Sequence, residues 1–200
     1  MEILLNAAKI IGEQGVVIAA TETFYALAAD PRSDEAVARI FNMKGRPADK
    51  PLPLIAAQTC LVLEQVEDPS DFLQCLVERF WPGSLTLVVS SKLSFAPRIG
   101  RFDGKIAVRV PPDCPARRIA AQSGGWLTAT SVNRAGEDPA DRVSAIPETI
   151  LEAVDMLVDS GPTPGGLPST IIEPLKRHYR ILRQGVVPEE DIKSALRKCS

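Results

Sequence analysis

The basic residues best placed for chemistry lie together in one short stretch. Lys44, Arg46 and Lys50 fall within residues 43–51, where Gly45 and two prolines predict an irregular connection. A guanidinium beside ammonium groups binds phosphate oxygens both by paired hydrogen bonds and by charge. The stretch is therefore a candidate polyphosphate site, although basic clusters between elements are also commonly just solvated surface.

Three further stretches place polar groups at the ends of predicted strands. Arg109 interrupts an apolar strand just before Pro111, near a carboxyl end where α/β proteins commonly bind ligands. Residues 128–133 carry hydroxyls and a final amide, which suits either a nucleotide site or an ordinary turn. Residues 161–170 are rich in Gly and Pro, so backbone amides there could approach an anion closely before two hydroxyl side chains.

Several common catalytic arrangements are excluded by what the sequence lacks. His178 is the only histidine and lies in a predicted strand, so a multi-histidine metal site is impossible and a catalytic triad would depend on it alone. Neither the Walker A pattern nor Gly-x-Gly-x-x-Gly occurs, so ATP would be bound by another geometry. The cysteines form no Cys-x-x-Cys, and we expect reduced thiols at Cys60, Cys75, Cys114 and Cys199.

Helix and strand patterns alternate along the chain, which predicts a single α/β domain with a twisted mixed sheet flanked by helices. Helices are expected at residues 2–13, 34–41 with Ser33 as a cap, 71–80, 115–122 and 189–198. Strands are expected at residues 16–20, 52–57, 85–90, 105–110, 126–130, 156–159, 169–173 and 179–182. A loop is expected to open at Thr21.

The composition is that of an ordinary globular protein. The chain has 200 residues, of which 45% are hydrophobic and 24% charged, and its net charge is -2; this is enough for one sizeable core. No apolar run reaches the roughly eighteen residues that a bilayer span needs, and no cleavage site follows the first helix. We therefore expect residues 1–200 to form one domain in the cytoplasm, without a membrane partner.

A series of short stretches resembles, in order and spacing, the YrdC-like family of threonylcarbamoyl-AMP synthases. They are Thr21–Leu27, Lys44–Pro47, Phe80–Gly83, Ile106–Pro111, Thr130–Asn133, Asp159–Gly161, Pro168–Ile171 and Leu182–Gly185. The resemblance covers nearly the whole chain. It implies the YrdC-like fold with a concave basic cavity, in the short form that lacks the additional C-terminal domain of longer members.

The resemblance also implies roles for individual residues. The family's Lys-x-Arg and Ser-x-Asn signatures are matched within residues 44–46 and 131–133. The implied ATP-binding residues are Lys44, Arg46, Lys50, Ser131, Asn133 and Arg183, with Lys44 and Arg46 as the catalytic pair. The implied contacts of threonine or its carboxylated form are Thr23, Arg109 and Ser169.

The implied reaction converts L-threonine, bicarbonate or CO2 and ATP into threonylcarbamoyl-AMP and pyrophosphate, for t6A modification of tRNA. The carboxylated amine of threonine would attack the α-phosphate of ATP. Two anionic reactants need positioning and cationic stabilisation more than a histidine base, which fits this composition. Mg2+ would neutralise the leaving pyrophosphate, and the product would pass to a threonylcarbamoyl transferase complex.

Four positions depart from the family pattern. Ala20 replaces a common proline, Val132 a common alanine, and Ile55 a histidine that some members carry near the amino-acid pocket. Ala26 replaces a common glycine and matters most, because glycine would permit a positive φ or a closer ligand approach.

Three alternative functions stay open at this point. The first is a module that binds double-stranded RNA or tRNA through the basic residues Lys44, Arg46, Lys50, Arg98, Arg101, Lys105 and Arg109. The second is a carbamoyl-transfer domain like that of hydrogenase-maturation proteins, whose usual neighbouring domains are missing here. The third is a YrdC-like paralogue without synthase activity, against which the presence of Ser131 and Asn133 argues.

Overall fold

The strands form two sheets. The computed structural model describes residues 2–47, 49–67, 69–100, 103–176 and 178–197. One sheet has the strand order β7-β2-β1-β8 and the other the order β10-β9-β4-β5-β3-β6. The strands are β1 (Val17–Ala20), β2 (Tyr25–Ala28), β3 (Leu54–Ala56), β4 (Leu85–Ser90), β5 (Lys105–Arg109), β6 (Trp126–Thr128), β7 (Thr130–Ser131), β8 (Met156–Val158), β9 (Thr170–Pro174) and β10 (Tyr179–Arg183).

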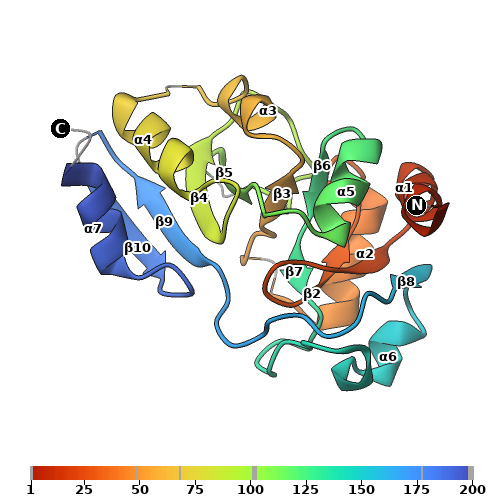
Figure 1. The fold of residues 1–200 in the computed structure, drawn as a ribbon. Coiled ribbons are helices and arrows are strands. Elements are labelled where there is room, and N and C mark those ends of the chain that lie inside the picture. Colours follow the sequence, from red (N-terminus) through yellow and green to blue (C-terminus); the bar gives the residue numbers. More distant parts are fainter. Residues whose placement is uncertain (1, 48, 68, 101–102, 177, 198–200) are drawn as a thin grey trace.

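Helices surround these sheets at both ends of the molecule. They are α1 (Glu2–Gly12), α2 (Asp34–Lys44), α3 (Thr59–Leu63), α4 (Asp71–Phe80), α5 (Pro115–Gln122), η1 (Val143–Ala145), α6 (Glu148–Leu151) and α7 (Glu189–Arg197). In Figure 1, α4 and α7 lie beside β9 and β10, whereas α1, α2, α5 and α6 gather around the smaller sheet. Among the described residues, no helix is long and apolar enough to cross a membrane.

Both sheets are mixed, as expected for an α/β fold. β1 pairs antiparallel with β2 and parallel with β8, while β4 pairs antiparallel with β5 and parallel with β9. The expected α/β architecture with twisted mixed sheet and flanking helices is therefore confirmed, with the strands divided between two sheets.

β1 shows why its sequence is a continuous apolar run. Val17 and Ala19 pack in a cluster with α1 and α5, whereas Ile18 and Ala20 face the main core. Successive side chains of a strand point to opposite faces, so a strand covered on both faces needs apolar residues at every position. The small sheet is thus held inside the molecule, with helices on one side and the main core on the other.

The chain passes from one sheet to the other at Ala129. The single strand expected at residues 126–130 is divided there into β6, in the larger sheet, and β7, in the smaller one. The Ala129 amide donates to the Pro53 carbonyl oxygen at 2.8 Å, and the Val132 amide donates to that of Tyr25 at 3.0 Å. This crossing carries the polar residues 130–133 into the space between the sheets.

The end of α2 is the most consequential difference from the expected elements. The Ser33 hydroxyl accepts from the Ala36 amide at 3.2 Å, which confirms the expected cap. The helix, however, continues beyond Phe41 to Lys44 and ends at Gly45, whose φ of 57° is the left-handed conformation that glycine adopts readily. Lys44 is therefore a helical residue and not part of the connection.

Other local expectations were also incomplete. β2, α3 and α6 were not predicted; β2 is rich in alanine, a weak strand former, and its pairing with β1 and β7 fixes it. Cys60 and Cys114 are free thiols as expected, but Cys75 is disulfide-bonded, so the expectation of a reduced thiol is wrong there. Cys199 lies outside the described residues.

Candidate active site

A cavity of about 1090 Å³ lies between the two sheets. The small sheet contributes residues of β2 and β7, and the larger sheet contributes residues of β4, β5, β9 and β10. The connection after α2 and the segment before β9 complete the wall. Of the nine residues expected in the site, the cavity brings together seven, which are Thr23, Arg46, Lys50, Arg109, Ser131, Ser169 and Arg183.

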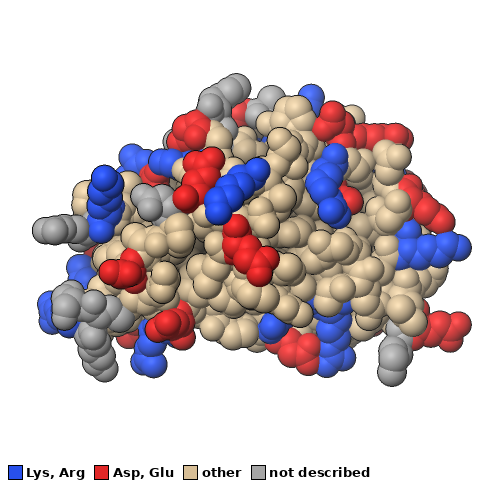
Figure 2. All heavy atoms as spheres, turned by 90° about the horizontal axis from the view of Figure 1, so that it is seen from above, with Lys and Arg blue, Asp and Glu red and all other residues tan. Residues whose placement is uncertain are grey.

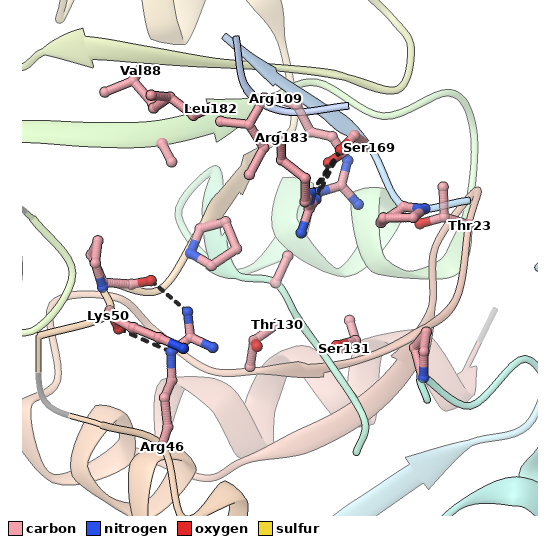
Figure 3. Close-up of a pocket in the computed structure, with 18 of the residues that line it drawn as sticks. Thr23, Arg46, Lys50, Val88, Arg109, Thr130, Ser131, Ser169, Leu182 and Arg183 are labelled. Carbon is pink, nitrogen blue, oxygen red and sulfur yellow. Dashed lines mark hydrogen bonds between the residues drawn. The ribbon is translucent and has the colours of Figure 1, made fainter. Parts of the chain in front are cut away.

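Arg46 comes from the connection after α2 and organises it. Its Nε donates to the Lys50 carbonyl oxygen at 2.9 Å and its Nη2 to the Pro51 carbonyl oxygen at 2.9 Å, as Figure 3 shows. Burial lowers the pKa of Arg46 from its ordinary value, and the charge of Asp49 opposes that shift. The guanidinium is thus a fixed cation whose protein hydrogen bonds go to uncharged oxygens.

Arg183 is a second guanidinium of the same kind, on the edge strand β10. Its Nε and Nη2 donate to the Ser169 carbonyl oxygen at 3.1 and 2.8 Å, and Nη2 also donates to Ser169 Oγ at 3.1 Å. Burial lowers the pKa of Arg183, and the charges of Arg109 and Arg46 lower it further. These cations repel one another, so an anion between them would relieve an unfavourable interaction.

Close backbone packing sets the relative position of Arg183 and Ser169. A Cβ on Gly185 would lie 2.1 Å from the Pro168 carbonyl oxygen, so only glycine lets the chain after β10 pass so near the start of β9. Thr86 Oγ1 lies 2.8 Å from Ser169 Oγ and fixes that hydroxyl from the neighbouring strand. Thr86 was not expected near the site. A polar residue within the otherwise apolar start of β4 is the sequence feature that could have indicated it.

Lys44 and Asn133 lie next to the cavity but not among the residues that line it. Lys44 is only 3% exposed, and its Nζ donates to Asn133 O at 2.8 Å, to Asn133 Oδ1 at 3.0 Å and to the Ser131 carbonyl oxygen. Burial and the neighbouring Arg46 charge lower the pKa of Lys44 to about 8. Ser131 Oγ donates to Asn133 Oδ1 at 2.6 Å. The two signatures therefore form one network, of which Arg46 and Ser131 face the cavity.

Arg109 has a carboxylate partner, unlike the other two arginines of the cavity. Its Nε lies 2.8 Å from Glu22 Oε1, and Ser84 Oγ donates to the same oxygen at 3.2 Å. Glu22 was not expected to be functional. The signal for it is a charged residue in the short bend between two apolar strands, between Thr21 and Thr23.

Two of the departures from the family pattern have a structural answer. Ala26 does not have a positive φ and is therefore not strained; among the described residues other than glycine, positive φ occurs at Gln14. Ala26 sits in β2 opposite Ser131 and lines the cavity, where its Cβ occupies space that a glycine would leave open. Ile55 is fully buried in the cluster with α5 and does not line the cavity.

The cavity contains little that could hold a metal ion by itself. Its acidic lining residues are Asp49 and Asp103, and no group of three or more His, Cys, Asp or Glu occurs within the described ranges. His178 is exposed, lies just before β10 and takes no part in the lining.

The described basic residues considered for RNA binding are divided between the cavity, where Arg46, Lys50 and Arg109 lie, and other parts of the molecule. Lys44 and Arg109 are buried, Lys105 is paired with Glu173 at 2.6 Å, and Arg98 lies over the Phe41 ring. Arg101 lies outside the described residues. On the face shown in Figure 2, basic and acidic side chains are interspersed. This face offers no single-sign patch of the kind that nucleic-acid binding favours.

Comparisons with known proteins agree with this geometry. The family model Sua5_yciO_yrdC, described as "Telomere recombination", matches residues 9–185. A protein of Bacillus subtilis named threonylcarbamoyl-AMP synthase is 30% identical over 96% of this chain and 56% of its own length. A protein of the same name from Idiomarina loihiensis is 32% identical over 80% of this chain and 88% of its own length.

A solved structure shares the fold closely. Pyrococcus abyssi Sua5 in complex with L-threonine has a TM-score of 0.87 and 32% identity, covering 96% of this chain and 56% of that protein. The chain thus spans about half the length of that protein and of the Bacillus subtilis relative. Since the family model covers most of the chain and the site residues fall within it, the chain belongs to the Sua5/YciO/YrdC family.

Proposed function

We propose that this protein is a threonylcarbamoyl-AMP synthase, which forms threonylcarbamoyl-AMP and pyrophosphate from L-threonine, bicarbonate or CO2 and ATP. The observation that carries the proposal is a large cavity in which Arg46 and Arg183 donate, among the described residues, to uncharged oxygens only. Arg46 is half-buried and Arg183 is exposed, and neither has a carboxylate within ion-pair distance among the described residues, so the cavity favours an anionic ligand. Family relatives named for this activity support the same choice.

The charges of the cavity suggest how the substrates lie. ATP would place its phosphates between Arg46, Lys50 and Arg183, with Ser131 near the nucleoside. Lys44 and Asn133 would support this site from behind the lining, through the network that holds the end of β7. Threonine would lie near Thr23, Arg109 and Ser169, on the other side of Arg183.

The chemistry needs no protein nucleophile. An oxygen of the threonine N-carboxylate attacks the α-phosphorus of ATP, a new P–O bond forms, and the bond to the bridging oxygen breaks to release pyrophosphate. Arg46 and Arg183 stabilise the charge that develops on the phosphates, and the walls hold the two anions in contact. Mg2+ enters with the nucleotide as part of the substrate and shares the charge of the leaving group.

The wider setting follows from the proposed product. An acyl adenylate of this kind is consumed by transfer to a nucleophile, which here would be tRNA, through a threonylcarbamoyl transferase complex in the cytoplasm. Residues 1–200 would act as a single domain, and a weak affinity for tRNA or double-stranded RNA is compatible with this role but not required by it.

The direct test incubates the purified protein with ATP, Mg2+, bicarbonate and each amino acid in turn. We expect pyrophosphate release that depends on threonine, together with the mass of the adenylate. Release with a different amino acid would change the substrate. No product with any amino acid would overturn the activity and favour a paralogue that has kept only the fold.

A further inference from the structure

Glu22 and Arg109 form an almost completely enclosed ion pair at one end of the cavity. Their side chains are 10% and 6% exposed, with Nε to Oε1 at 2.8 Å and Nη2 to Oε2 at 3.4 Å. Ser84 Oγ adds a third hydrogen bond to the same carboxylate. A pair with this enclosure is held in one geometry, so Arg109 cannot swing freely toward a ligand.

The pairing leaves part of the guanidinium available. Glu22 takes the Nε hydrogen and one Nη2 hydrogen, and no protein acceptor for Nη1 is found in the described part of the chain. Arg109 lines the cavity at this position, as Figure 3 shows. It can therefore donate to a ligand oxygen, while Glu22 offsets part of the positive charge that Arg109 still exerts on Arg183.

The other two arginines of the cavity have different partners: Arg183 lies beside Ser169 and near Arg109, and Arg46 lies on the far side of the cavity, as Figure 3 shows. Arg46 and Arg183 are hydrogen-bonded to carbonyl and hydroxyl oxygens, and Asp49 is the nearby carboxylate that affects Arg46. A polyphosphate with several charges gains far more from these two arginines than from Arg109 with its paired carboxylate, because Coulomb attraction scales with net charge. A single carboxylate, with one charge and a planar shape, is well served by the donors of Arg109.

We propose that Glu22 is a positioning residue that offsets part of the charge of Arg109 and so keeps polyphosphate out of the amino-acid end of the cavity. This role rests on the proposed function, because that function supplies the two ligands, ATP and threonine. The separation of a polyphosphate from a carboxylate ligand can nevertheless be measured by binding alone, without turnover. Without Glu22, Arg109 would be a third cation of the cavity without a paired carboxylate, beside Arg46 and Arg183. Pyrophosphate could then occupy the space where the amino acid belongs.

The test measures binding of inorganic pyrophosphate and of L-threonine by calorimetry, separately and in competition. In Glu22→Gln we expect pyrophosphate to bind at least about fivefold more tightly and to compete with threonine, whereas both bind together in the wild type. Glu22→Asp keeps the charge and should restore the wild-type behaviour. The control is Glu173→Gln, because Glu173 is also an enclosed carboxylate, paired with Lys105 and Arg180, but does not line the cavity.

A second variant guards against misfolding of Glu22→Gln, which leaves a buried charge unpaired. The double variant Glu22→Gln/Arg109→Gln removes both charges. We expect wild-type affinity for pyrophosphate and at least tenfold weaker binding of threonine.

The outcomes separate this role from the synthase activity. Unchanged pyrophosphate affinity and no competition in Glu22→Gln, or wild-type threonine affinity in the double variant, would overturn the sorting role. A wild-type protein that binds neither probe would overturn the site itself. Binding of both probes without product in the amino-acid assay would refute only the activity, and the Glu22 variants would still decide the sorting role.

Discussion

Two of the three described arginines that line the cavity, Arg46 and Arg183, differ in their partners from a group of arginines on the outer surface. Five arginines away from the cavity have a carboxylate within ion-pair distance; they are Arg32, Arg39, Arg118, Arg142 and Arg180. Arg46 and Arg183 have carbonyl and hydroxyl oxygens instead. Exposed ion pairs contribute little to stability, whereas a cation without a paired carboxylate at a cavity wall is available to an anionic ligand. The difference indicates that the cavity cations are kept for a ligand.

Among the substitutions that test this difference, replacing Arg46 should lower turnover the most. Arg46→Ala removes a charge-assisted contact of about 1.5 to 3 kcal/mol, so we expect turnover to fall ten- to a hundredfold or more in the pyrophosphate-release assay. The loss includes a structural part, because Arg46 also holds the carbonyl groups of Lys50 and Pro51.

Two further variants separate charge from geometry at Arg46. Arg46→Lys keeps the positive charge but loses the paired donors of the planar guanidinium, and we expect an intermediate rate. Arg118→Ala removes an exposed guanidinium that pairs with Asp113 and should leave the rate unchanged. Near-normal turnover in Arg46→Ala would contradict the role assigned to the cavity cations.

The next largest effect concerns the charge state of Lys44. Its pKa is lowered to about 8 by burial and by Arg46. Below that pH the ammonium adds a positive charge behind the phosphate site and donates to all three of its acceptors. Above it the neutral amine has only two hydrogens, so charge and one hydrogen bond are lost. We therefore expect ATP affinity, measured without threonine, to fall about fivefold between about pH 7 and 9.

A charge-free variant provides the control for this pH dependence. Lys44→Met should bind ATP weakly at every pH in that range and should show no decline. If wild-type affinity stayed constant or rose with pH, Lys44 would not contribute a titrating charge to the site.

Many residues near the cavity could be predicted from the sequence. Whether each one lines the cavity or is buried behind its wall could not. The basic loop pointed to Arg46, strand ends pointed to Arg109 and Ser131, and the family resemblance alone pointed to Arg183. All four line the cavity, while their roles stay predictions. That Lys44 lies behind the lining depends on α2 continuing to Gly45, which a count of apolar residues does not determine. Burial is a property of the packed elements and not of local sequence.

The fold was predictable to a similar degree and for a similar reason. Long patterned segments such as α4 and β4 match their expected ranges, because amphipathic or apolar periodicity extends over the whole element. β2 is four residues long and alanine-rich, and only its two neighbouring strands define it. The role of Glu22 was not predicted, because its ion-pair partner, Arg109, is far away in the sequence.

Arg117 sharpens the comparison, because it bonds like a cavity arginine but lies outside the cavity. Its Nε donates to the Ala57 carbonyl oxygen at 2.8 Å and its Nη1 to the Pro111 carbonyl oxygen at 3.1 Å. We expect Arg117→Ala to lower the free energy of unfolding in urea by about 1 to 3 kcal/mol, while ATP affinity stays unchanged. A loss of ATP affinity like that of Arg46→Ala would mean that carbonyl-bonded arginines act through general stability, and that position in the cavity is not what sets Arg46 and Arg183 apart.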